Sequence, residues 1–184
     1  MRELALNILD IAQNSVRANA SVVEIGVTAS VADNRLTLSV KDDGTGMSEQ
    51  MVKTVTDPFT TTRTTRKVGM GLPLLKMDAE LCDGTFDLDS VEGKGTTVTT
   101  TYRLDHVDRP PLGDLAATVT MLINGAPHIR WILHYGTDTD GFTFDSEEVR
   151  QMLDGVAIDE PEVLSGISSL LADNINESNG GIII

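Results

Sequence analysis

The sequence predicts an α/β protein, in which amphipathic helices alternate with pairs of half-buried strands. Residues 3–18 carry apolar side chains at helical spacing, as a helix with one buried face does. Residues 23–27 and 36–40 alternate apolar with polar side chains, which is typical of strands that bury one face. The turn-forming pair Asp33-Asn34 between these two strands predicts a hairpin.

The same order of elements then occurs a second time. Residues 72–82 predict another helix, with Pro73 in its first turn, where proline is tolerated. Strands are expected at 86–88 and 98–102, on either side of the turn at 93–95.

The chain changes character after residue 104. Residues 105–113 are rich in proline and polar residues, and they predict a linker between a domain of residues 1–104 and a small acidic α/β appendage of residues 114–184. The appendage is expected to contain strands at 117–123, 129–135 and 142–144, a helix capped by Asp145 and Glu148 that runs through Leu153, and a last helix over 160–175.

Composition narrows the classes of function. The 184 residues carry a net charge of −14, and residues 105–184 supply −11 of it, with three arginines, no lysine and 14 acids. Such a surface repels phosphate backbones and anionic lipid, so neither nucleic acid nor a membrane is expected as a partner. No apolar run approaches the roughly 20 residues that span a bilayer. The lone Cys82 on an apolar helix pattern is expected in the core and fits a reducing cytoplasm, where we expect the protein to reside.

Four short motifs occur in one order within the first hundred residues. They are the segments 10–17 (DIAQNSVR), 42–47 (DDGTGM), 69–72 (GMGL) and 93–97 (GKGTT). Each motif alone is weak, because acidic residues before glycines are common in turns. Their order and spacing together predict a nucleotide site.

The first motif lies on the predicted helix 3–18, where Asp10, Asn14 and Arg17 share a face. The Asn14 carbonyl suits Mg²⁺, which prefers oxygen ligands together with water and phosphates. Arg17 can neutralise phosphate charge, and Asp10 can orient or deprotonate an attacking group. The same residues also fit the solvated side of an ordinary amphipathic helix, and the motif alone leaves both interpretations open.

The glycine motifs suit a base and its phosphates. Asp42 ends a strand, where its carboxylate can accept from the exocyclic amine of adenine, and Gly44 and Gly46 allow the backbone to approach closely. Asp-Gly is equally a common turn pair. Residues 69–72 directly precede a helix whose first amides can hold phosphate oxygens. Residues 60–68 are threonine-rich and basic, and we expect them to be a lid that is disordered without nucleotide.

Together these segments resemble the N box and the three glycine boxes of the GHKL superfamily. That superfamily includes gyrase-type ATPases, the large heat-shock chaperone, sensor histidine kinases and mismatch-repair ATPases. The segment 58–62 is similar to the phenylalanine box of sensor kinases. The resemblance covers residues 3–104 and implies the Bergerat, or histidine kinase-like ATPase, fold, a two-layer α/β sandwich, with ATP and Mg²⁺ as cofactors.

The resemblance also implies a role for each matching residue. Asn14 would ligate Mg²⁺ and, with Asp10, form the catalytic pair, while Asp42 would read adenine. Phe59 would anchor the lid, and Thr96 would hold the base through water. The full set of implied nucleotide contacts is Asn14, Arg17, Asp42, Gly44, Gly46, Met47, Phe59, Arg66, Lys67, Gly69, Gly71, Leu72 and Thr96.

The sequence departs from the superfamily pattern at three points. Asp10 stands where the ATPases have glutamate and many sensor kinases have asparagine, which leaves hydrolysis open. Pro73 replaces a glycine of the third motif. A sensor kinase carries its phosphorylated histidine upstream of the first motif, whereas two residues precede Glu3 here, so we expect a stand-alone module. The three histidines lack the helical acidic context of a phosphoacceptor and are expected to be structural or solvent-facing: His106, His128 and His134.

Two functions are consistent with these features. The first is a cytoplasmic ATP- and Mg²⁺-binding protein that acts on a partner protein by phosphoryl transfer, as a histidine- or serine-directed kinase, or that hydrolyses ATP weakly. The second is a switch, in which ATP orders residues 60–68 and a partner recognises the ordered form. In both, residues 114–184 would serve docking or homodimerisation. Gyrase-like and mismatch-repair enzymes are disfavoured, because their second domain supplies a lysine and no lysine follows Lys94.

Overall fold

A six-stranded sheet forms one layer of the molecule, with strand order β3-β4-β2-β1-β5-β6. It is seen in a computed structural model that describes residues 3–55, 71–179 and 182. Neighbouring strands are antiparallel, except that β1 and β5 run parallel. The strands are β1 (Val22–Ser30), β2 (Arg35–Asp42), β3 (Phe86–Val91), β4 (Gly95–Arg103), β5 (Arg130–Gly136) and β6 (Gly141–Asp145).

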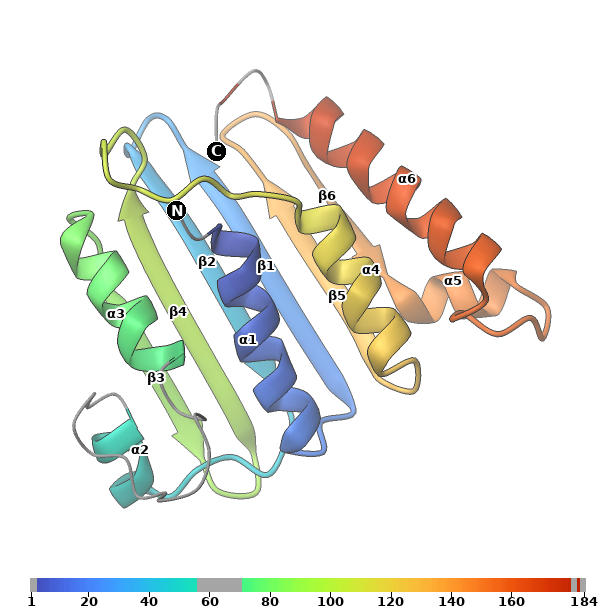
Figure 1. Cartoon of the computed structure of the whole chain (residues 1–184), viewed down its shortest axis with the longest axis horizontal. Coiled ribbons are helices and arrows are strands. Elements are labelled where there is room, and N and C mark those ends of the chain that lie inside the picture. Colours follow the sequence, from blue (N-terminus) through green and yellow to red (C-terminus); the bar gives the residue numbers. More distant parts are fainter. Residues whose placement is uncertain (1–2, 56–70, 180–181, 183–184) are drawn as a thin grey trace.

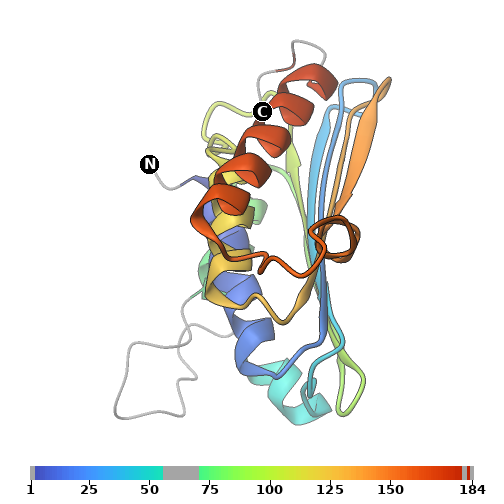
Figure 2. The ribbon, with the colours of Figure 1, turned by 90° about the vertical axis from the view of Figure 1, so that its right-hand side faces the viewer.

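The helices form a second layer against one face of this sheet. Figure 1 shows α1, α3, α4 and α6 side by side in front of the strands, and Figure 2 shows this layer edge-on, with the other face of the sheet bare of helices in the described part of the chain. The predicted two-layer α/β sandwich is therefore confirmed. The helices are α1 (Leu4–Arg17), α2 (Glu49–Val55), α3 (Gly71–Leu81), α4 (Leu115–Gly125), α5 (Ser146–Met152) and α6 (Pro161–Ser178).

The core lies between the two layers and follows from the alternation of the strands. Every second residue of β1, including Val23, Ile25 and Val27, is buried under the helices. From the helix layer, α1 contributes Leu4 and Ile8, each at most 1% exposed. Burying one such side chain stabilises the fold by about 1.5–3 kcal/mol. Cys82 is also buried, as expected, and burial raises the pKa of its thiol.

The elements predicted for residues 3–104 are confirmed to within a few residues, from α1 to β4. One element was missed. The short helix α2 (Glu49–Val55) buries none of its residues, so it has no apolar stripe by which periodicity reveals a helix.

The prediction of a strand at 117–123 was wrong, because these residues belong to α4. Asp114 caps the helix by accepting from the amide of Ala117 at 2.8 Å. Buried Leu115, Val119 and Leu122 then recur at helical spacing. A short apolar run fits a buried helix as well as a strand, and only the N-cap and this longer period distinguish the two.

The remaining elements of the C-terminal region have the predicted type. Strand β5 pairs with β1 in parallel, so residues 130–145 continue the same sheet rather than starting another. Asp145 caps α5 as predicted, accepting from the amide of Glu147 at 2.9 Å.

The segment 105–113 connects β4 to α4 and packs against the start of α1. The amides of Leu4 and Ala5 donate to the carbonyls of Pro111 and Leu112, at 2.9 and 2.8 Å. These bonds satisfy two of the amides that a helix leaves unpaired at its N-terminus. Among the described residues, no helix combines the length and the apolar character that a bilayer crossing requires.

Candidate functional site

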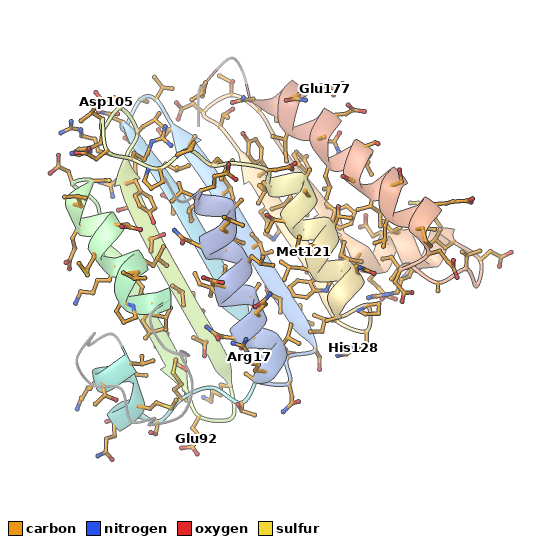
Figure 3. All side chains as sticks on the ribbon, in the orientation of Figure 1. Arg17, Glu92, Asp105, Met121, His128 and Glu177 are labelled. Carbon is orange, nitrogen blue, oxygen red and sulfur yellow. The ribbon has the colours of Figure 1, made fainter. Side chains whose placement is uncertain are left out.

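The predicted site residues within the described part of the chain gather at one end of the sheet. The C-terminal half of α1, the end of β2, the start of α3 and the β3–β4 turn all lie there (Figure 1). Figure 3 marks this end by Arg17 on α1 and Glu92 in the β3–β4 turn. The motifs 10–17, 42–47 and 93–97 thus meet in space, and the motif 69–72 reaches the same place through Gly71 and Leu72.

The Asp42 carboxylate is held by two donors at the end of β2. Its Oδ2 accepts from the Ser15 hydroxyl at 2.6 Å, and its Oδ1 accepts from the amide of Gly44 at 2.9 Å. Ser15 is 1% exposed, whereas Asp42 is half-buried. The carboxylate is therefore fixed on its protein side, and its remaining lone pairs can only accept from a ligand.

The neighbouring acid Asp43 has a different role. Its Oδ1 accepts from the amides of Ser21 and Val22, at 2.7 and 2.9 Å. These contacts tie the start of β1 to the end of β2. Asp43 therefore stabilises the turn, and Asp42 remains the acid of the pair that is a candidate for binding a ligand.

The loop after Asp42 needs glycine because it packs tightly on backbone. A Cβ on Gly46, whose φ is +64°, would lie 2.1 Å from the carbonyl oxygen of Val91. A Cβ on Gly44 would lie 2.8 Å from the carbonyl oxygen of Ala18. The amide of Thr45 also donates to Ala18, at 2.9 Å. These glycines thus bring the loop against both α1 and the β3–β4 turn.

A row of hydroxyl groups continues from Asp42 across the neighbouring strands. Thr96 is directly opposite Asp42 in the β2–β4 pairing, and Ser90 is opposite Thr96 in the β3–β4 pairing. The Ser90 Oγ lies 2.8 Å from the Thr96 Oγ1, and it accepts from the amide of Met47 at 2.9 Å. This hydroxyl connects the second motif with the fourth.

The polar residues of α1 line the adjoining edge of the site. Arg17 Nη1 donates to Asn14 Oδ1 at 2.9 Å, and both side chains are exposed. A Cβ on Gly71 would lie 3.9 Å from the Cβ of Asp10, so the start of α3 is next to Asp10. Leu72 is partly buried and packs against the core.

The residues around Asn14 can hold Mg²⁺ only if water and a phosphate ligand complete the coordination of the metal. The described residues include no group of three acids, histidines or cysteines that could hold a metal by itself. Mg²⁺ is commonly held by one or two protein oxygens, with water and phosphates completing its shell. Asn14 Oδ1 can supply one such oxygen, because its second lone pair is left over from Arg17 and the exposed guanidinium can turn toward phosphate.

Several predicted contacts lie outside the described residues: Phe59, Arg66, Lys67, Gly69 and the whole lid segment 60–68. The three histidines were expected to be structural or solvent-facing, and the structure gives their surroundings. His128 is exposed near the end of α4 (Figure 3), His134 contacts Thr143 at 3.0 Å, and His106 accepts from the amide of Asp108 at 3.1 Å.

Sequence reasoning missed two residues at this site, Ser15 and Ser90. Ser15 lies within the first motif on the buried stripe of α1, so a hydroxyl among apolar positions was a signal that it has a partner. Ser90 is outside all four motifs and gave no such signal. Its contacts depend on the register of β3 against β4.

Comparison with known proteins gives consistent results. The family described as histidine kinase-, DNA gyrase B-, and HSP90-like ATPase matches residues 1–106. A putative sensor protein of Shewanella frigidimarina is 29% identical over 109 residues, which are 59% of this chain and 16% of that protein. Sporulation kinase E of Bacillus subtilis is 33% identical over 97 residues, 52% of this chain and 13% of the kinase. The sensor histidine kinase ZraS of Escherichia coli is 29% identical over 106 residues, which are 58% of this chain and 23% of ZraS.

The chain thus spans less than a quarter of the length of these relatives. Among solved structures, the N-terminal domain of a DNA repair protein superposes on 79% of this chain and 52% of that chain, with a TM-score of 0.51 and 15% identity, a likeness of fold. The family match covers more than half of the chain and all four sequence motifs. The chain therefore belongs to the histidine kinase-, DNA gyrase B- and HSP90-like ATPases.

Proposed function

We propose that this protein binds ATP with Mg²⁺ in the cytoplasm and acts on a partner protein by phosphoryl transfer. The observation that carries the proposal is the Asp42 carboxylate, oriented by Ser15 and Gly44 at the same end of the sheet as Asn14 and Arg17. The proposed acceptor for the base, Asp42, and the proposed phosphate contacts on α1 thus lie at the same end of the sheet.

The carboxylate favours adenine over guanine. Ser15 and Gly44 supply the donors on the protein side, so Asp42 offers only lone pairs to a base. The 6-amino group of adenine donates to such an acceptor, whereas the 6-oxygen of guanine is repelled by it. A site that requires a hydrogen-bond donor on its ligand discriminates strongly against a ligand that lacks it.

The phosphates are proposed to lie between α1 and the start of α3. Asn14 would contribute one oxygen to Mg²⁺, which bridges phosphate oxygens and neutralises their charge. Arg17 would leave Asn14 and contact phosphate. The amides of Gly71 and Leu72 begin α3 and would donate to phosphate oxygens. Met47, Gly44, Gly46 and Thr96 would surround the base, and Phe59, Arg66, Lys67 and Gly69 would close over the nucleotide.

Asp10 distinguishes phosphoryl transfer from nucleotide-gated binding. It lies one helical turn before Asn14 and beside Gly71, which supports a role for Asp10 near the terminal phosphate. If it orients water or an acceptor hydroxyl, Asp10→Asn should slow turnover by roughly 10²-fold with little change in ATP affinity. Transfer to a histidine should respond much less, because a neutral imidazole is already nucleophilic.

The experiment follows transfer of label from γ-labelled ATP to water and to a co-purified partner, with Asp10→Asn beside the parent protein. The control variant is Gln13→Asn, because Gln13 is exposed on the same helix. Asn7 is buried, so a change there would disturb the fold. Turnover that is equal in Asp10→Asn and the parent contradicts the base role. If the parent transfers no label while ATP changes its affinity for the partner, the protein is a switch, with residues 114–184 serving docking or dimerisation.

A further inference from the structure

We propose that Ser90 is a positioning residue that makes Thr96 a hydrogen-bond acceptor toward the base, and so adds to the selection of adenine over 6-oxopurines. This inference rests on the proposed nucleotide function and concerns two residues of the same site. It is carried by the hydroxyl row that joins β3, β4 and β2.

The three residues of the row face the helix layer together. Asp42 pairs with Thr96, and Thr96 pairs with Ser90, so all three side chains project from the same face of the sheet. The neighbouring residue pair on that face, Val40 and Val98, is buried in the core. Ser90 and Thr96 are half-buried, at the border between the core and the site.

The direction of each hydrogen bond follows from the number of hydrogens. The Ser90 hydroxyl has one hydrogen, and it donates to the carbonyl of Gly95 at 3.0 Å, because a carbonyl can only accept. The Met47 amide donates to the Ser90 Oγ at 2.9 Å. The 2.8 Å contact between the Ser90 Oγ and the Thr96 Oγ1 is compatible with either hydroxyl as donor. Because the Ser90 hydrogen is used by the Gly95 carbonyl, we assign this hydrogen bond to the hydrogen of Thr96.

Thr96 then has no hydrogen left to offer to a ligand. Thr96 is directly opposite Asp42 in the β2–β4 pairing, so the two side chains are neighbours on one face of the sheet. The Asp42 carboxylate likewise already has its protein donors, Ser15 and Gly44. The two opposite residues thus present acceptors alone. The 6-amino group of adenine has two hydrogens and can donate to both acceptors, directly or through one water. A 6-oxo group can only accept, so it cannot form a hydrogen bond with either of them.

The test compares the binding of ATP and inosine triphosphate, which differ at the purine 6-position, amino against oxo, and at N1, which carries a hydrogen only in inosine. Calorimetry with Mg²⁺ on the full chain gives the ratio of the two dissociation constants. In Ser90→Ala the Thr96 hydroxyl is released and can turn to donate to the 6-oxygen. We expect the preference for ATP to fall about three- to tenfold, the range of a single hydrogen bond. Ser90→Thr keeps the hydroxyl and should retain the preference of the parent.

A matched control removes a hydroxyl from the same hairpin. Thr101 and Thr85 form another hydroxyl pair, at 2.9 Å, at the far end of β4. Thr101→Val should change thermal stability and leave the ratio of dissociation constants unaltered. Thr96→Val is a second variant in case Ser90→Ala does not fold, and it should weaken ATP binding while leaving inosine triphosphate binding nearly unchanged.

The outcomes separate this inference from the proposed function. If the parent binds ATP and Ser90→Ala weakens both nucleotides by the same factor, Ser90 is merely structural and the inference is overturned. A parent protein that binds no ATP would instead refute the proposed function itself.

Discussion

Replacing Ser15 by alanine tests whether α1 holds the Asp42 carboxylate. The Ser15 hydroxyl donates to Asp42 at 2.6 Å, and a hydrogen bond to a charged group contributes about 1.5–3 kcal/mol. Asp42 is half-buried, so the lower end of that range applies. Alanine is the better helix former by roughly 0.5 kcal/mol, which offsets part of the loss. We expect the free energy of unfolding to fall by about 1 kcal/mol, and Tm by about 2–4 °C.

Thermal and urea unfolding measure this change, and a double-mutant cycle assigns it. In an Asp42→Ala background the acceptor is gone, so Ser15→Ala should be neutral or slightly stabilising. Ser169→Ala, at an exposed position of α6, is the matched control and should show only the helix-propensity gain of roughly 0.5 kcal/mol. ATP affinity should fall with Ser15→Ala, because the carboxylate loses its orientation. Equal destabilisation in both backgrounds would show that the hydrogen bond does not contribute, and the reasoning would be wrong.

Three further predictions concern single residues. Asn14→Ala should fold normally, because alanine is a good helix former in α1. ATP binding by this variant should no longer be strengthened by Mg²⁺, which calorimetry with and without the metal measures. An unchanged effect of Mg²⁺ would mean that Asn14 is not a metal ligand. Gly46→Ala should lower the free energy of unfolding by more than about 2 kcal/mol, because the new Cβ would meet the Val91 carbonyl. Gly93 also has a positive φ but has open space around it, so Gly93→Ala should lower it by only about 1 kcal/mol. Equal losses in urea unfolding would contradict the packing argument. The Arg130 guanidinium approaches the Asp145 carboxylate to 2.5 Å and lowers its pKa. This ion pair therefore stabilises the fold at pH values above the unfolded pKa of about 4, and its contribution disappears as the pH falls through the folded pKa. The stability gap between Asp145→Asn and the parent should therefore narrow from pH 5 to pH 3, and a constant gap would refute it.

The sequence predicted the elements whose patterns reflect local physics. Strands β1 and β2 alternate because one face packs under helices, and α1 has one apolar stripe because only that stripe touches the sheet. Asp145 was identifiable as an N-cap by residue type alone. The run 117–123 was misassigned because its apolar residues fit both periods, and the Asp114 cap that decides the matter lies outside the run.

Residues of the candidate site could be proposed from the sequence only where a motif lies within one short segment. Asp42, Asn14 and Arg17 were proposed because acid, amide and guanidinium occur beside glycines or at helical spacing. The parallel pairing of β5 with β1, which continues the sheet beyond residue 104, depends on contacts about a hundred residues apart. The contacts of Ser90 depend on the register of the β3–β4 hairpin and on the approach of Met47 from another part of the chain. Neither a long-range pairing nor a strand register is marked by a local pattern in the sequence.

Calorimetric titration of the full chain with ATP and GTP, in the presence of Mg²⁺, tests the central claim most directly. The parent should bind ATP and strongly prefer it to GTP. Asp42→Asn should weaken ATP binding by about 2 kcal/mol, roughly thirtyfold, because an acceptor is exchanged for a group that also donates. Asp43→Asn is the matched control: it alters an acid one residue away whose carboxylate serves the backbone of β1, so any loss should appear in stability rather than in base preference. Equal affinity of the parent for ATP and GTP, or an Asp42→Asn variant that binds ATP as well as the parent does, would contradict the account.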